Sequence, residues 1–159
     1  MKTIQKSIDI TLLVTRVVVG ITVAAHGAQK LFGWFGGYGF DGTMGFFTET
    51  IGLPYALGLL VILAESLGMV ALAFGLLTRF LSGSLILIMI GAIVTTHLEH
   101  GFFMNWNGAQ GGEGFEFHIL VIALAFVTLV NGAGAYSLDH VIRKNLQTKE
   151  TQSAQTSPG

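Results

Sequence analysis

The sequence contains no cysteine and few charged residues. The absence of cysteine from its 159 residues excludes disulfide bonds, thiolate zinc sites and iron–sulfur clusters held by this chain. Charged residues make up 11% of the chain, whereas they are about 25% of a typical soluble domain. The net charge is −1, and no long basic run is present to bind nucleic-acid phosphates. The low fraction of charged residues indicates a membrane protein.

Several catalytic motifs are also missing. The sequence has no phosphate-binding glycine loop with its lysine, no dinucleotide fingerprint after a strand and no nucleophile elbow. Paired histidines on facing spans, which would hold haem, are not evident either. We therefore expect no cofactor bound by ligands of this chain, so any electron transfer would need a redox centre in a partner protein.

Apolar residues, in contrast, are abundant. They make up 52% of the chain, and the mean hydropathy is +0.68. Four apolar runs, at about residues 10–35, 54–77, 80–97 and 115–130, have lengths close to the roughly 17–25 residues of a membrane-spanning helix. We predict an all-α integral membrane four-helix bundle over residues 1–142, followed by a disordered tail over residues 143–159.

The distribution of basic residues predicts the orientation. Residues near span ends on one side are enriched in Lys and Arg, while chiefly Lys30 lies near the other side. The basic residues of the first side are Lys2, Lys6, Arg79, Arg143, Lys144 and Lys149. Both termini are therefore predicted to be cytoplasmic, in a multi-pass protein of a prokaryotic inner membrane.

Ionisable residues inside the spans are the most informative ones. Each costs on the order of 2.5–3.5 kcal/mol to insert, so such residues usually pair, face a cavity or have a function. Arg16 and Lys30 share one face of the first helix with two glycines, and Glu65 lies beside a stripe of small residues on the second. We predict a buried Glu65–Arg16 ion pair, with His26 as the alternative partner of Glu65. Two roles stay open, namely fixing the helix register and exchanging protons with a membrane-soluble substrate.

A second polar cluster is predicted where the spans end on the side opposite the termini. Its members are His26, Lys30, His97, His100, Glu113, Glu116 and His118. Imidazole and carboxylate groups could hydrogen-bond a quinone and move its protons. Ligation of Zn, Cu or Fe is a weaker alternative, and we assign no metal ligand. Glu116 and His118 diverge by about 200° on a helix, so they should not both point inward.

The order and spacing of several motifs resemble the DoxX family of small four-span prokaryotic membrane proteins. The resemblance extends from about Arg16 to Asp139. The matching residues are Arg16 with Gly20, the run 26–33 (His-Gly-Ala-Gln-Lys-Leu-Phe-Gly), Glu65 with Gly68, the run 75–79 (Gly-Leu-Leu-Thr-Arg), the run 114–116 (Gly-Phe-Glu) and the run 132–139 (Gly-Ala-Gly-Ala-Tyr-Ser-Leu-Asp). One departure is Met69, where family members often carry another small residue.

The resemblance implies a four-helix bundle linked to redox physiology, since relatives include membrane subunits of thiosulfate:quinone oxidoreductases. We expect a quinone-interacting or accessory subunit of a membrane oxidoreductase. Glu65, His26 and Arg16 would then exchange protons with the quinone or anchor it. Further quinone-binding residues would be Lys30, His97, Glu116 and His118.

Two other functions stay open at this stage. One is a non-catalytic scaffold or assembly factor for a redox or stress-response enzyme, and the other, weaker one is a small-molecule transporter. The expected partners are the lipid bilayer, a quinone and a redox-enzyme subunit, with a homo-oligomer as a further option. The sequence names neither the substrate nor the reaction.

Overall fold

The computed structural model describes residues 1–156, and side chains are described for all of these except residues 150 and 153–156. Helices account for the regular structure of these described residues. They run in the order α1 (Lys2–Phe32), η1 (Trp34–Gly36), α2 (Gly39–Gly45), η2 (Phe46–Thr50), α3 (Tyr55–Leu63), η3 (Ala64–Gly68), α4 (Met69–Ala73), α5 (Thr78–Ala92), η4 (Ile93–His97), η5 (Leu98–His100), α6 (Glu116–Asn131) and α7 (Leu138–Thr156). The predicted all-α fold class is confirmed.

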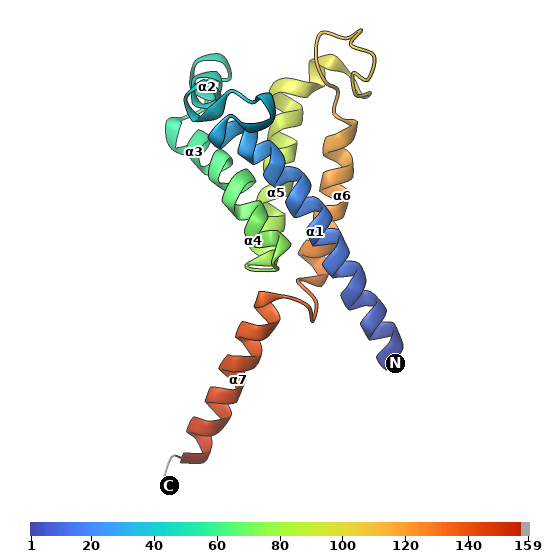
Figure 1. The fold of residues 1–159 in the computed structure, drawn as a ribbon, viewed down its shortest axis with the longest axis vertical. Coiled ribbons are helices and arrows are strands. Elements are labelled where there is room, and N and C mark those ends of the chain that lie inside the picture. The colour runs from blue at the N-terminus through green and yellow to red at the C-terminus, as the bar shows by residue number, and fades with distance from the viewer. Residues whose placement is uncertain (157–159) are drawn as a thin grey trace.

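Three helical stretches are long and apolar enough to cross a membrane. They are Lys2–Phe32, Tyr55–Ala73 and Thr78–His100, and a shorter apolar helix, Glu116–Asn131, lies beside them. Together these four stretches form the bundle in Figure 1, in which both termini lie at one end. We call this end the terminus end, and the opposite end, formed by α2 and the loop over residues 101–115, the loop end.

The second and third stretches each contain a π-helical turn. Tyr55–Ala73 is α3, η3 and α4 in sequence, and η3 carries Glu65. Thr78–His100 ends in η4 and η5, so His97 and His100 lie at its loop end. A π turn locally widens a helix, and such turns occur frequently at functional sites. Both turns thus bring ionisable residues of the predicted clusters out of regular α-helical register.

The core lies where α1, α4, α5 and α6 meet. It consists of Val19, Val23, Met69, Leu72, Leu81, Leu85, Met89, Val121 and Ala125. A buried hydrogen bond of 2.7 Å between the hydroxyls of Ser82 and Thr128 joins α5 to α6 in this region. Because lipid offers no strong hydrophobic drive for helix association, close packing and such polar contacts hold the helices together.

Two glycines bring α1 against the second stretch. A Cβ atom on Gly20 would lie 2.7 Å from the carbonyl oxygen of Met69, and one on Gly27 would overlap the backbone of Glu65 and Ser66. Backbone therefore packs against backbone at both positions, as the small-residue face of α1 predicts. This contact fixes which residues of the two helices lie at the same height.

The terminus end is closed by the segment between α6 and α7. The Asp139 carboxylate accepts hydrogen bonds from the amides of Leu77 (2.8 Å) and Thr78 (2.9 Å), and so caps the first turn of α5. The Asp9 carboxylate accepts a bond of 3.0 Å from the Ala135 amide. The Asp139 amide in turn donates to the Gly75 carbonyl at 2.9 Å. The runs 75–79 and 132–139 singled out in the sequence thus bind each other here.

Helix α7 differs from the disordered tail expected over residues 143–159. Residues 138–156 are helical, and Figure 1 shows α7 leaving the bundle at the terminus end. The Ser137 hydroxyl accepts a bond of 3.2 Å from the His140 amide at its start. Lys, Glu and Gln in this segment have high intrinsic helix propensity. A low content of apolar residues therefore did not exclude a helix. Residues 157–159 lie outside the described residues.

The predicted cytoplasmic location of both termini can be tested with cysteines, since the natural chain has none. Thr148→Cys lies on α7 and Asn107→Cys lies in the loop-end segment, both at exposed positions. A membrane-impermeant maleimide should label Asn107→Cys in intact spheroplasts, and Thr148→Cys only after permeabilisation. The reverse labelling pattern would contradict the orientation.

The contact at Gly27 predicts a large effect of one added methyl group. Gly27→Ala should lower the stability by about 1–3 kcal/mol, because the helices must move apart, and thermal unfolding in detergent measures the loss. Gly45→Ala is the matched control, since a Cβ there meets nothing within 4 Å, and alanine favours helix by about 0.5–1 kcal/mol. Equal melting temperatures for the two variants would show that the crossing is less tight than described.

Candidate functional site

Glu65 is the centre of the candidate site. It lies in η3 with 4% of its surface exposed, and its carboxylate binds the ammonium group of Lys30 from α1. The Lys30 side chain is 29% exposed. The reason for this pairing is the contact at Gly27, which places α1 directly against Glu65, with Lys30 one turn further along the same helix face.

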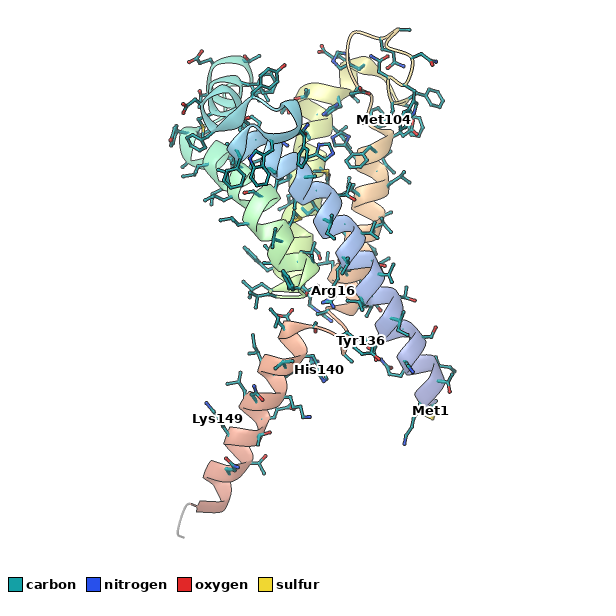
Figure 2. The ribbon with its side chains drawn as sticks, in the orientation of Figure 1. Met1, Arg16, Met104, Tyr136, His140 and Lys149 are labelled. Carbon is teal, nitrogen blue, oxygen red and sulfur yellow. The ribbon has the colours of Figure 1, made fainter. Side chains whose placement is uncertain are left out.

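The predicted Glu65–Arg16 pair is wrong. Gly27 lies level with Glu65, so Arg16, eleven residues earlier, is about 16 Å away along α1. The Arg16 guanidinium instead donates to the Tyr136 carbonyl. Figure 2 shows these two residues together at the terminus end, whereas Met104 lies at the loop end. Depths counted separately along each apolar run missed this register, because the relative height of the two helices is set by their contact at Gly27 and not by the start of each run.

Arg16 therefore belongs to the junction at the terminus end. It is 1% exposed, and a Cβ on Gly75 would collide with its Nη1 atom. Its Nε and Nη1 atoms have no hydrogen-bond partner within the described residues. At this position Arg16 holds the 132–137 segment against α1. It is not near Glu65.

Three histidines lie near the Lys30–Glu65 pair and line the same cavity. The rings of His97 and His118 lie 4.2 Å apart, and the His26 ring lies 5.6 Å from that of Phe117. His97 Nδ1 is 2.8 Å from the Glu113 carbonyl. Because a carbonyl only accepts hydrogen bonds, this Nδ1 carries a proton, and Nε2 is the acceptor when the ring is neutral. His118 is 8% exposed, and its Nδ1 has no partner in residues 1–156.

A cavity of about 520 Å³ joins these groups. Its polar lining consists of His26, Lys30, Glu65, Thr95, Thr96, His97, Glu113 and His118. Its apolar lining comes mainly from α3, η2, α5 and the start of α6, and includes Phe46, Phe47, Val61, Leu87 and Phe117. The site is thus an apolar chamber with ionisable groups at one side, a combination typical of small-molecule sites.

Glu116 does not line this cavity. Its carboxylate accepts a bond of 3.1 Å from the Met104 amide, while Glu113 accepts one of 2.7 Å from the Asn105 amide. Both carboxylates thereby shape the loop-end segment. The prediction that Glu116 and His118 point in different directions is confirmed, since His118 lines the chamber.

The remaining predicted residues divide as follows. His26, Lys30, His97 and His118 line the cavity with Glu65, whereas Arg16 and His100 do not. His100 lies 3.5 Å from the Glu99 carboxylate. Within the part of the chain that the structure describes, no group of three or more His, Asp or Glu side chains is placed to hold a metal ion.

The apolar walls were not identified from sequence. Phe46, Phe47 and Phe117 line the cavity, but phenylalanine is so common in this chain that no pattern marks these three. A usable signal was the position of Phe117, which lies next to His118 in the first turn of α6.

Comparison with known proteins assigns the chain to a family. The family model described as DoxX matches residues 11–98, more than half of the chain. The chain belongs to the DoxX family. No solved structure matches it. The DoxX match includes the Lys30–Glu65 pair, His26 and His97, but ends before His118.

Two curated relatives cover most of this DoxX chain. It is 31% identical over 140 residues to a Bacillus subtilis (strain 168) protein named "Putative oxidoreductase CatD", with 88% of this chain and 92% of that protein aligned. It is 31% identical over 142 residues to an Escherichia coli (strain K12) protein named "Inner membrane protein YqjF", with 88% and 98% aligned. With its apolar helices, this DoxX protein is a multi-pass inner-membrane protein.

The ion pair predicts a characteristic pattern of stability changes. Glu65→Gln leaves the Lys30 ammonium without its partner. Breaking a fully buried pair costs about 3–5 kcal/mol, and the partial exposure of Lys30 should reduce this to about 1–3 kcal/mol. Adding Lys30→Met should restore part of the loss, because neither charge is then unpaired. Thermal unfolding of the four proteins gives the coupling energy.

Glu49→Gln serves as the control for this cycle, because Glu49 is exposed on η2. Its melting temperature should equal that of the natural protein. A double variant that loses the full sum of the two single losses would contradict a direct Lys30–Glu65 interaction.

Proposed function

We propose that this protein binds a quinone in the chamber beside Glu65 and exchanges its protons, as a membrane subunit of an oxidoreductase. The observation that carries the proposal is the convergence of Lys30, Glu65 and His118 on one largely apolar cavity. A quinone has the matching chemistry, namely a flat apolar ring with two carbonyl oxygens that accept hydrogen bonds.

The size of the chamber supports this assignment. Sites for small molecules are typically about 300–1,000 Å³, and this one has about 520 Å³. The side chains of Phe46, Phe47 and Phe117 supply aromatic surfaces, against which a ring can stack at centroid distances of about 4.5–7 Å.

Lys30 and His118 have complementary roles in this proposal. The Lys30 ammonium donates a hydrogen bond to a carbonyl oxygen and stabilises the negative charge that develops there on reduction. The His118 ring lines the chamber and would exchange a proton with a bound oxygen, while its buried Nδ1 lacks a partner in the described chain. The carboxylate of Glu65 holds Lys30 in place and is itself a proton acceptor for a hydroquinone hydroxyl.

The reaction balances as two electrons and two protons per quinone. Each carbonyl oxygen takes one proton to form the hydroquinone, and the reverse reaction releases both. His26 and His97 also line the chamber, and they would relay the protons. The electrons would pass to or from a flavin or comparable redox centre of a partner protein. The name of the B. subtilis relative supports an oxidoreductase system.

The alternative is a non-catalytic scaffold for a redox enzyme. One observation favours the scaffold. Arg16 and Asp139 belong to the motifs that resemble the DoxX family, but they bind backbone groups outside the cavity. A scaffold, however, does not require an ion pair and several histidines to line a chamber.

Quinone binding by the purified protein in lipid nanodiscs tests the proposal. A tail-less naphthoquinone should bind to the natural protein, and its affinity should change when the ligand is reduced. Glu65→Gln and His118→Phe should each weaken binding by about 10–100-fold, the equivalent of one hydrogen bond to a charged or buried group.

Glu116→Gln is the matched control, because Glu116 lies on the same helix as His118 but outside the chamber. Its quinone affinity should stay within about twofold of the natural value. Absence of quinone binding, or unchanged binding in Glu65→Gln, would exclude the proposed function, and co-purification of a redox enzyme with such a protein would favour the scaffold.

A further inference from the structure

One wall of the chamber is formed by two helices that do not pack on each other along their length. Leu57 and Val61 of α3, together with Leu87 and Gly91 of α5, line the same cavity. Helix α3 packs against α1 and α2, whereas α5 packs against α6 and meets the second stretch at η3 and α4. Figure 1 shows α4 and α5 meeting near their turn and α3 diverging from α5 towards the loop end.

The residues along this wall are exposed. Leu57 is 45% exposed and Leu87 is 72% exposed, and a Cβ atom on Gly91 would meet nothing within 4 Å. All three lie in stretches that are long and apolar enough to span the membrane. Exposure at such positions is exposure to lipid, so the chamber and the bilayer interior meet between α3 and α5.

We propose that this opening is a lateral portal, and that the ligand is a lipid-soluble quinone whose alkyl or polyprenyl tail lies between α3 and α5. Its ring then reaches the Lys30–Glu65 pair while the tail extends into the bilayer. This inference rests on the proposed function and adds the substrate class, a tailed membrane quinone rather than a small water-soluble one.

The depth of the polar groups favours a quinone over a phospholipid. Glu65 lies ten residues, about 15 Å, beyond the start of α3 at Tyr55, which is half of a hydrocarbon core of about 30 Å. A phospholipid would have to bring its charged phosphate to this depth, where an unpaired charge is costly. An uncharged ring enters more easily, because its carbonyl oxygens meet hydrogen-bond donors at the end of the path.

A second cavity gives the rival route. It has about 510 Å³, lies beside the first and shares His26, Lys30, Phe46 and Phe47 with it. Its other lining residues are Gln29 of α1 and residues between positions 36 and 43, including Tyr38 and Thr43. A water-soluble ligand would enter through this cavity, so closing the lateral portal would leave its binding intact.

Gly91→Trp separates the two routes. A side chain can be added at this position, because a Cβ on Gly91 meets nothing within 4 Å, and the indole would extend into the space between α3 and α5. We expect binding of a quinone with a polyprenyl tail to weaken by about tenfold or more, because the added ring occupies the path of the tail. Because Gly91 also lines the chamber, binding of the tail-less naphthoquinone should weaken as well, but by about threefold or less. Both affinities are measured in nanodiscs, so that the tailed quinone is already in lipid before it binds.

Leu120→Trp is the matched control, since Leu120 is 61% exposed on α6 and does not line the chamber. It should leave both affinities unchanged. If Gly91→Trp fails to fold, Leu87→Trp fills the same path from a position that is already exposed. A tailed quinone with a photoreactive group at the end of its tail should also cross-link to α3 or α5 peptides in the natural protein. The yield of this cross-link should be lower in Gly91→Trp.

The outcomes distinguish this inference from the proposed function. Equal effects of Gly91→Trp on tailed and tail-less ligands, or no effect on either, would overturn the portal while quinone binding stands. A change in oligomeric state with unchanged binding of the tailed ligand would overturn it as well, and would assign this face to a second copy of the chain. Failure of the natural protein to bind either ligand would overturn both proposals.

Discussion

The close approach of α1 to the second membrane stretch is the contact on which the rest of the structure depends. At Gly20 and Gly27 the two helices touch through backbone atoms, and no side chain larger than hydrogen fits between them. Since apolar side chains gain little by leaving lipid, such close packing supplies much of the association energy in a membrane. The same contact sets the helix register, and the register brings Lys30 to Glu65.

Polar residues separate into two groups at opposite ends of this crossing. At the terminus end, Arg16, Asp9 and Asp139 bind backbone groups of the turn before α5 and of the segment before α7. Nearer the loop end, Lys30, Glu65, His26, His97 and His118 line a chamber. The first group binds backbone groups and does not line this chamber, although Arg16 keeps two nitrogens without a partner in the described residues, whereas the second group contains the Lys30–Glu65 ion pair and lines the chamber. Chemistry is therefore to be sought at the loop end.

The chamber is bounded unevenly. Phe117 and two residues of the loop over 101–115, Met104 and Glu113, line it at the loop end, and the proposed portal to lipid lies between α3 and α5. A site of this shape suits a ligand that lives in the membrane but carries a polar ring. The proposed quinone function and the lateral portal are two consequences of one geometry, an ionisable pair buried at mid-membrane depth beside an opening to hydrocarbon.

The sequence by itself determined the membrane class, the all-α fold, the DoxX resemblance and the ionisable residues of the chamber, because composition, apolar run length and helical periodicity are local properties. It also predicted that Glu116 and His118 diverge, since 100° per residue is a local rule. Only the tertiary structure decided that Glu65 pairs with Lys30 rather than Arg16 and that Arg16 holds the terminus end together. It also decided that phenylalanines from α6 and η2 complete the site. Such pairings depend on the relative height and rotation of separate helices, and these were set by two backbone contacts that no single helix encodes.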